Sequence, residues 1–330
     1  MPKKVKLGLI GCGGIIHMHL NQLANVKSAK VVGMADPSEA SLARVVARHP
    51  ELADVPTFPD YQSLLDNVEM DGVIIASPHT LHYEQIMAAL DRGLHVLCEK
   101  PMTCSVQHAK DVLAKARQKK RIVMLAYQRH FSPAFRYARQ LVQSGQLGKV
   151  TFVQALQAQE WLRGTRGTWR QDPALSGGGQ LNDSGSHLLD ITLWVTDLVP
   201  DTVYAAIDNR GTKVDILSGL TVKYKGGAIG SLAIVGDAPR WWEDVTFYTE
   251  EAALYVREGR VILQTPGPKG KTEDVTGRLR YKGDADKNFV DSILGRDEPQ
   301  TPAICGLRVI QLTEAAWESA RTGKPTKVKT

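Results

Sequence analysis

The sequence predicts an α/β protein with an N-terminal Rossmann-type, doubly wound parallel sheet and a C-terminal α+β domain with a large, mostly antiparallel open sheet. In the first 125 residues, apolar runs without polar alternation are separated by segments of helical period, which is typical of a parallel sheet covered on both faces. Further on, longer runs alternate with period two between Gly or Asn turns. With 330 residues, two domains are expected, at 1–124 and 125–330, and the last helix is a candidate to pack back on the first domain.

The first half contains five strand-like runs and five helical segments in alternation. The expected strands are Val5–Ile10, Lys30–Ala35, Gly72–Ala76, Leu94–Cys98 and Ile122–Ala126. The expected helices are Ile16–Val26, Ser38–Arg48, Tyr61–Asn67, Tyr83–Arg92 and Val106–Lys119.

The second half opens with a helical segment at Pro133–Ser144 and then becomes rich in strands. Runs such as "KVTFVQALQAQ", "DILSGLTVKY" and "DVTFYTEEAALYVREG" predict an antiparallel sheet with one exposed face. Further helices are expected at Ser184–Val195, about Asp284–Leu294 and about Ile304–Ala320. The exposed face is a natural contact surface for a homodimer or homotetramer, and Leu232, Ile234, Phe247 and Leu254 are candidates for it.

Composition excludes several classes of protein. The chain has 41 Lys and Arg against 35 Asp and Glu, and the positive charges are scattered, so no nucleic-acid partner is expected. No apolar run reaches the roughly 18 residues of a membrane span, and the N-terminus has no secretory pattern. The four cysteines form neither a disulfide framework nor a zinc pattern. We therefore expect a cytoplasmic protein with no membrane partner.

The stretch "LGLIGCGGIIHMHL" places a glycine-rich turn between a strand and a helix. Gly11 can make the tight turn, and Gly13 can let the backbone approach a pyrophosphate at the helix N-terminus. Asp36 ends the next strand, where a carboxylate can accept both ribose hydroxyls of NAD and repel the 2′-phosphate of NADP. Ile16 is unusual, because that position normally permits close packing of helix on strand, and we interpret it as a slight displacement of the helix.

Two more motifs follow the ends of buried strands. "ASPHTLHYE" places Ser77, Pro78 and His79 near the cofactor edge of a parallel sheet, although a plain loop with Thr80 as a helix cap is the simpler interpretation. "HVLCEKPMT" places Lys100 at the same edge. A surface lysine is the ordinary alternative, but a partly desolvated lysine has a lowered pKa and can exchange protons near neutrality, with Glu99 anchoring the loop.

The stretch "SGGGQLNDSGSHLLDITLW" places Asp183, His187 and Asp190 at i, i+4 and i+7, on one helix face. Three interpretations stay open on this spacing. The residues could hold a divalent metal. His187 could act as an acid–base group oriented by Asp183. Alternatively, Asp183 or Ser184 could cap the helix beside a buried histidine.

Together these motifs resemble the glucose–fructose oxidoreductase/inositol dehydrogenase (Gfo/Idh/MocA) family over nearly the whole chain. The resemblance implies a nicotinamide cofactor between the domains, Lys100 and His187 handling the proton of a substrate hydroxyl, and Asp183 supporting them, with no metal. Ile16, His79 and His130 depart from the family pattern and put substrate preference in doubt.

The resemblance yields two sets of binding residues. The expected cofactor-binding residues are Gly11, Gly13, Gly14, Ile15, Asp36, Ser77, Pro78, His79, His82, Glu99 and Lys100. The expected substrate-binding residues are Arg129, Trp161, Arg163, Trp169, Arg170, Asp183 and His187, in which Trp offers an apolar face to a sugar ring and Arg offers hydrogen-bond donors.

These expectations favour an oxidoreductase that uses NAD rather than NADP to transfer a hydride to or from a secondary hydroxyl or keto carbon of a sugar, sugar derivative or inositol. Two alternatives stay open. The same residues would serve NAD-dependent glycoside cleavage through transient oxidation at C3 and elimination. The second alternative is a non-catalytic sensor that binds a dinucleotide or a sugar.

Overall fold

The chain forms two compact units in a computed structural model that describes residues 4–329. The first unit comprises residues 1–103, 107–127 and 283–306, and the second comprises residues 104–106, 128–282 and 307–330. The segment 283–306 thus clusters with the first unit, whereas the sequence analysis placed it in the second domain.

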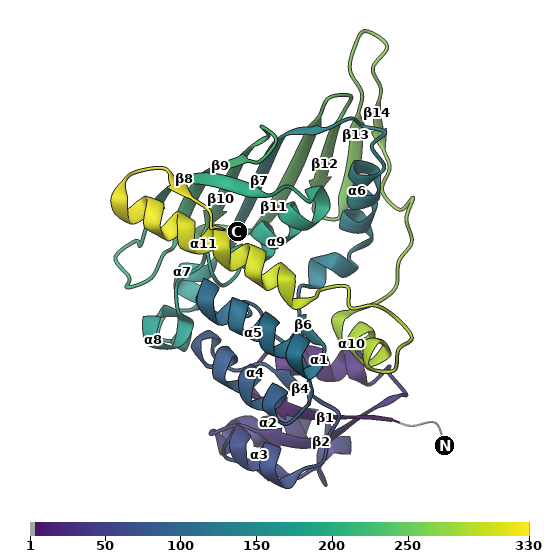
Figure 1. Ribbon diagram of the computed structural model, residues 1–330, viewed down its shortest axis with the longest axis vertical. Coiled ribbons are helices and arrows are strands. Elements are labelled where there is room, and N and C mark those ends of the chain that lie inside the picture. Colours follow the sequence, from purple (N-terminus) through teal and green to yellow (C-terminus); the bar gives the residue numbers. More distant parts are fainter. Residues whose placement is uncertain (1–3, 330) are drawn as a thin grey trace. The chain divides into compact units, whose positions relative to one another are not determined.

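The first unit is built on a six-stranded sheet in the order β3-β2-β1-β4-β5-β6. Every adjacent pair is parallel, which confirms the predicted doubly wound sheet. The strands β4, β5 and β6 are almost wholly buried, as expected for strands covered on both faces. Figure 1 shows the helices that accompany this sheet. The short strand β3 was not predicted. The strands are β1 Val5–Ile10, β2 Ala29–Ala35, β3 Thr57–Phe58, β4 Gly72–Ile75, β5 His95–Cys98 and β6 Val123–Leu125.

Helices connect these strands, and side-chain caps fix several of their starts. Asp60 accepts the backbone N–H of Ser63 at 2.7 Å at the start of α3, and Asp284 accepts that of Lys287 at 2.8 Å at the start of α10. The helices are α1 Ile16–Leu23, α2 Glu39–Arg48, α3 Tyr61–Asn67, α4 His82–Asp91, α5 Val106–Lys119 and α10 Ala285–Ile293, with short 3-10 turns at Pro50–Leu52 and His79–Leu81.

The second unit is built on a nine-stranded sheet in the order β14-β13-β12-β11-β7-β10-β9-β8-β15. Its pairs are antiparallel except for β10 with β7, so the predicted, mostly antiparallel sheet is confirmed. The strands are β7 Val150–Glu160, β8 Pro200–Asp208, β9 Leu217–Tyr224, β10 Ile229–Val235, β11 Asp237–Thr249, β12 Ala253–Arg257, β13 Arg260–Gln264, β14 Thr272–Asp274 and β15 Thr326–Lys327.

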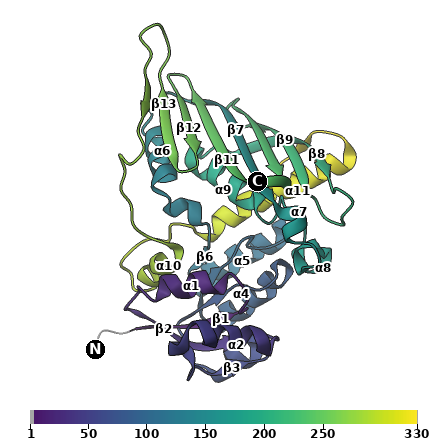
Figure 2. The same cartoon turned by 180° about the vertical axis from the view of Figure 1, so that it is seen from behind.

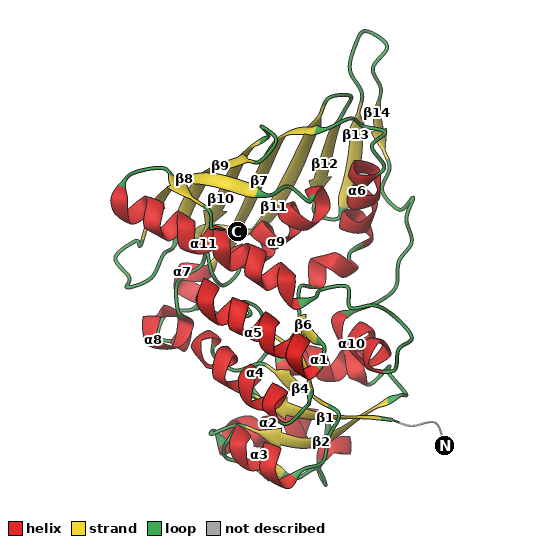
Figure 3. Cartoon of the chain, in the orientation of Figure 1, coloured by secondary structure: helices red, strands yellow, loops and turns green. Residues whose placement is uncertain are grey.

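Helices of the second unit cover one face of this sheet, as the secondary-structure colouring in Figure 3 shows. They include α6 Pro133–Gln143, α9 Gly185–Thr196 and most of α11 Ala303–Thr322. The short helices α7 Trp161–Gly164 and α8 Pro173–Ser176 follow β7, and 3-10 turns lie at Gln128–Phe131 and Trp169–Gln171.

Seen from behind, the other face of the nine-stranded sheet carries no helix of the described chain (Figure 2). The expectation that Leu232, Ile234, Phe247 and Leu254 lie on the exposed face is wrong, because each is at most 1% exposed. The period-two pattern locates two faces but cannot say which of them meets the helices. Among the described residues, no helix combines the length and apolar character needed to cross a membrane.

Candidate active site

The glycine loop after β1 leaves open space where a ligand backbone could approach. Gly11 has φ +88°, and a side chain there would collide with the backbone of Ala76 and Ser77 at 2.6–2.8 Å. A Cβ added to Gly13 or Gly14, by contrast, would meet nothing within 4 Å. The loop is therefore packed tightly on one side and open on the other, as a pyrophosphate cradle requires.

Ile16 does not block this loop. It is the first residue of α1 and is fully buried, so its side chain lies in the core, while its neighbour Ile15 is 36% exposed. Burial, and then the charge of Asp36, raise the pKa of the Cys12 thiol in the same loop to about 12, so the thiol stays neutral.

Asp36 joins the end of β2 to the glycine loop. One carboxylate oxygen accepts the backbone N–H of Cys12 at 2.7 Å, and the other accepts that of Ser38 at 2.8 Å. A carboxylate offers about four lone-pair positions, so both oxygens keep capacity to accept a hydroxyl.

The loops after β4 and β5 are tied together by His82. Its Nδ1 lies 2.7 Å from the carbonyl oxygen of Pro101, and its Nε2 lies 2.9 Å from that of Ser77. The ring is fully buried, and burial lowers its pKa against the opposing effect of the two carbonyl oxygens. This position suits a brace between two loops better than the expected direct contact with a cofactor. His79, in the neighbouring 3-10 turn, is also buried, at 4% exposure.

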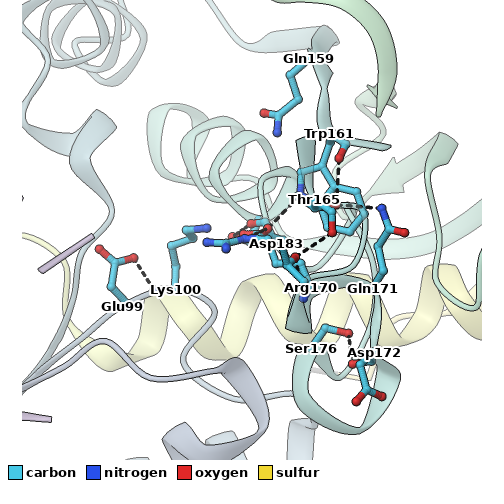
Figure 4. Close-up of polar contacts among 12 residues, drawn as sticks. Glu99, Lys100, Gln159, Trp161, Thr165, Arg170, Gln171, Asp172, Ser176 and Asp183 are labelled. Atoms are coloured by element: carbon cyan, nitrogen blue, oxygen red, sulfur yellow. Dashed lines mark hydrogen bonds and ion pairs between the residues drawn. The ribbon is translucent and has the colours of Figure 1, made fainter. Parts of the chain in front are cut away.

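Lys100 follows β5 and is partly exposed. Its backbone N–H donates to Oε2 of Glu99 at 3.2 Å, as Figure 4 shows. Because β2, β1, β4 and β5 are neighbouring parallel strands, their carboxyl ends meet at one edge. The first unit therefore brings the glycine loop, Asp36, Ser77 and Lys100 to the same edge, as the sequence analysis expected.

In the second unit, Asp183 is an almost fully buried carboxylate, 3% exposed. Its Oδ2 accepts a hydrogen bond from Nε1 of Trp161 at 2.9 Å and one from Nε of Arg170 at 3.1 Å (Figure 4). The guanidinium of Arg170 also lies 4.5 Å from the ring centre of Trp169. The ion pair and two donors keep a buried charge satisfied.

The expected shared helix face of Asp183, His187 and Asp190 is only partly correct. The helix α9 begins at Gly185, so Asp183 lies in the loop before it, and His187 lies in its first turn. Asp190 contacts a different histidine: its Oδ2 is 2.7 Å from Nε2 of His130, and both side chains are buried.

The other expected substrate residues divide by exposure. Trp161 is 2% exposed and packs against Val214 and Ile216, so its ring is enclosed by the second unit, and its Nε1 donates to Asp183. The side chain of Arg163 is 74% exposed and lies beside Glu160. Trp169 stays partly exposed.

Arg129 is enclosed among side chains that sequence reasoning did not single out. It forms an ion pair with Glu243, and one terminal nitrogen lies 3.4 Å from Oε1 of Gln157. Burial lowers the pKa of Arg129, and burial raises that of Glu243 against the opposing effect of the Arg129 charge. No pattern in the sequence marks Glu243 as the partner of an arginine 114 residues earlier.

Asp215 is a second residue that sequence reasoning missed. Its carboxylate accepts the backbone N–H groups of Gly179 at 2.8 Å and Leu181 at 2.6 Å, and Nε1 of Trp317 donates to it at 3.3 Å. Burial raises the pKa of Asp215, and these donors oppose that effect. Asp215 therefore fixes the glycine-rich loop that leads into Asp183.

Two family profiles match the chain. Residues 5–127 match the GFO/IDH/MocA oxidoreductase family with an NAD-binding Rossmann fold, and residues 135–255 match the GFO/IDH/MocA C-terminal domain. The chain belongs to the GFO/IDH/MocA oxidoreductase family. This confirms the resemblance noted from the sequence.

Individual relatives have low sequence identity to this chain, but the matches cover most of it. Glucose-6-phosphate 3-dehydrogenase of Bacillus subtilis is 29% identical over 64% of this chain, a match that spans 60% of the relative's length. The NADP-dependent D-xylose 1-dehydrogenase 2 of Haloferax volcanii is 29% identical over 96% of this chain and 97% of its own. Among solved structures, the WlbA dehydrogenase of Bordetella pertussis, in complex with NADH and UDP-GlcNAcA, has a TM-score of 0.83 at 20% identity over 100% of this chain and 99% of that one.

Proposed function

We propose that this chain is an NAD-dependent dehydrogenase that transfers a hydride between the nicotinamide and a secondary hydroxyl or keto carbon of a sugar, sugar derivative or inositol. The observation that carries the proposal is the open backbone at Gly13 and Gly14, on the sheet edge that also presents Asp36 and Lys100. The names of the relatives, a glucose-6-phosphate 3-dehydrogenase and a D-xylose 1-dehydrogenase, support a carbohydrate substrate.

The residues present fit a dinucleotide. Gly11, Gly13 and the N-terminus of α1 would hold the pyrophosphate, because the loop is free of side chains there and its N–H groups favour an anion. Asp36 would accept the adenosine ribose hydroxyls. Ser77, Pro78 and Glu99 would line the nicotinamide end of the site. When bound, NAD would supply the hydride acceptor, or NADH the donor.

The protein's own part in the chemistry is to hold and move a proton. The ammonium of Lys100 would stabilise an alkoxide forming on the substrate, and His187 would take or return the hydroxyl proton at a ring nitrogen. Asp183 would act as a fixed buried anion beside them, held by Trp161 and Arg170.

A panel of sugars, sugar acids and inositols tested with NAD and with NADP, followed at the nicotinamide absorbance, checks this function. We expect turnover with at least one member of the panel and preference for NAD. Release of an aglycone from a glycoside with no net NADH would instead favour redox-neutral cleavage. Absence of saturable NADH binding by fluorescence or calorimetry would contradict both.

Replacing Asp36 tests the cofactor preference. We expect Asp36→Ser to lower the ratio of kcat/KM for NAD over NADP by about tenfold, because the carboxylate that repels a 2′-phosphate is removed. Glu69→Ser is the matched control, since Glu69 is an exposed acid, 92% exposed at its side chain, that precedes β4 at the opposite end of the strands. A ratio that stays unchanged in Asp36→Ser would contradict the assignment.

A further inference from the structure

A histidine with no assigned role lies fully buried in the first unit between two carboxylates. His19, on α1, has Nδ1 2.9 Å from Oδ1 and 3.0 Å from Oδ2 of Asp286, which belongs to α10. Its Nε2 lies 3.2 Å from Oε1 of Glu99, after β5. His19 and Asp286 are 0% exposed and Glu99 is 6% exposed. One ring therefore joins three segments that are far apart in the sequence.

The hydrogen-bond geometry indicates that the His19 ring is positively charged. An ionised carboxylate accepts hydrogen bonds and donates none, so a histidine that bonds to carboxylates through both nitrogens must carry a proton on each. Burial opposes the charged ring, but the carboxylates of Asp286 and Glu99 overcome it and raise the pKa of His19 to about 10. In return, His19 lowers the pKa of Glu99 against the effect of burial, whereas burial raises the pKa of Asp286 against the effect of His19.

Glu99 connects His19 to Lys100. While Oε1 of Glu99 faces His19, its Oε2 accepts the backbone N–H of Lys100 at 3.2 Å. The charge of Lys100 also lowers the pKa of Glu99, so the two residues are coupled electrostatically as well as by the hydrogen bond. His19 thus holds one carboxylate oxygen of Glu99, and the other oxygen holds the backbone of Lys100.

We infer that Asp286, His19 and Glu99 form a buried chain of charged hydrogen bonds that positions Lys100 for proton transfer, with His19 and Asp286 as positioning residues. This inference rests on the proposed function of Lys100. It also joins helix α1 to the loop that carries Lys100.

Stability alone is a poor explanation for this chain. Burying three ionisable groups carries a large desolvation cost, and well-packed apolar residues often stabilise a core as well or better. Breaking such a chain at one member leaves a buried charge without its partner. A positioning role explains why this series of hydrogen bonds ends at Glu99, the residue that holds the backbone of Lys100.

The kinetic test compares His19→Gln, Asp286→Asn and the double variant in the full-length protein. We expect each single change to lower kcat with the best substrate of the panel by about tenfold or more, because a misplaced reacting group costs rate. The dissociation constant of NADH should change by less than about threefold, since the glycine loop is untouched. The double variant should resemble the single ones, because all three break the same chain.

His95→Gln is the matched control for this comparison. His95 is also a histidine of the first unit, but it begins β5 at the amino end of the strand, where its Nδ1 accepts the backbone N–H of Ile122 at 3.1 Å. We expect kcat to stay unchanged in it. Unchanged kcat in His19→Gln, or losses in His95→Gln of the same size, would overturn the inference.

Nuclear magnetic resonance separates this inference from the proposed function. In ¹⁵N-labelled protein, both ring nitrogens of His19 should stay protonated from about pH 6 to about pH 8.5, and His19→Gln should shift the Lys100 amide resonance while His95→Gln leaves it in place. Lys100 and His82 face Glu99, and Asp284 faces Asp286, so their titration is followed in parallel. The inference would be contradicted by a His19 ring that titrates near its ordinary pKa, or by a Lys100 amide resonance that does not shift in His19→Gln. Both outcomes can be observed even if no sugar is turned over.

Discussion

Replacing Lys100 with methionine is expected to lower kcat by about a thousandfold, the middle of the range for loss of a positioned proton-handling group. Methionine keeps most of the length and apolar volume of the side chain but has no ammonium to stabilise the alkoxide. NADH should bind with nearly the same affinity, because the glycine loop and Asp36 are unchanged. Single-turnover absorbance measurements at saturating cofactor separate the loss in the chemical step from any loss in binding.

Lys120→Met is the matched control for Lys100→Met, since Lys120 lies after α5, outside the loops at the carboxyl edge of the sheet. We expect it to keep the activity of the unmodified protein. If Lys100→Met also kept that activity, the side chain would take no part in the reaction.

The second large effect is expected from Gly179→Ala in the loop before α9. A Cβ at this position would lie 2.0 Å from the backbone oxygen and 2.4 Å from the backbone nitrogen of Asp215. Backbone cannot move away as a flexible side chain can, so the loop itself must shift. We expect the free energy of unfolding to fall by about 3 kcal/mol. Because Asp215 fixes the loop that leads into Asp183, kcat should fall as well.

Chemical denaturation measures the change in unfolding free energy, with Gly219→Ala as the control. A Cβ on Gly219, in β9, would meet nothing within 4 Å, so that substitution should change the free energy of unfolding by less than about 0.5 kcal/mol. Equal stability of the two variants would show that the contact of Gly179 with Asp215 is looser than the structure describes.

The part of the site that could be predicted is the part that local pattern and sheet topology determine. Gly11, Asp36 and Lys100 each follow an apolar strand, and parallel strands deliver their carboxyl ends to one edge. A reader of the sequence can therefore bring them together without knowing any side-chain contact.

The parts that could not be predicted depend on contacts between distant segments. His19 and Asp286 are 267 residues apart, and nothing near either residue marks it as half of a pair. The same holds for Gly179 and Asp215. A run of three glycines indicates that another backbone segment approaches closely, but it does not identify that segment. The burial of Trp161 could not be predicted either, because an indole suits a binding surface and a core equally well.

The proposed function assigns Lys100 and His187 to the same substrate hydroxyl. It is tested most directly by measuring kcat for Lys100→Met, His187→Gln and the variant that combines them. If the two side chains handle one proton together, the combined variant should be no more than about threefold slower than the slower single variant. Losses that multiply, or a His187→Gln variant with undiminished kcat, would contradict the account.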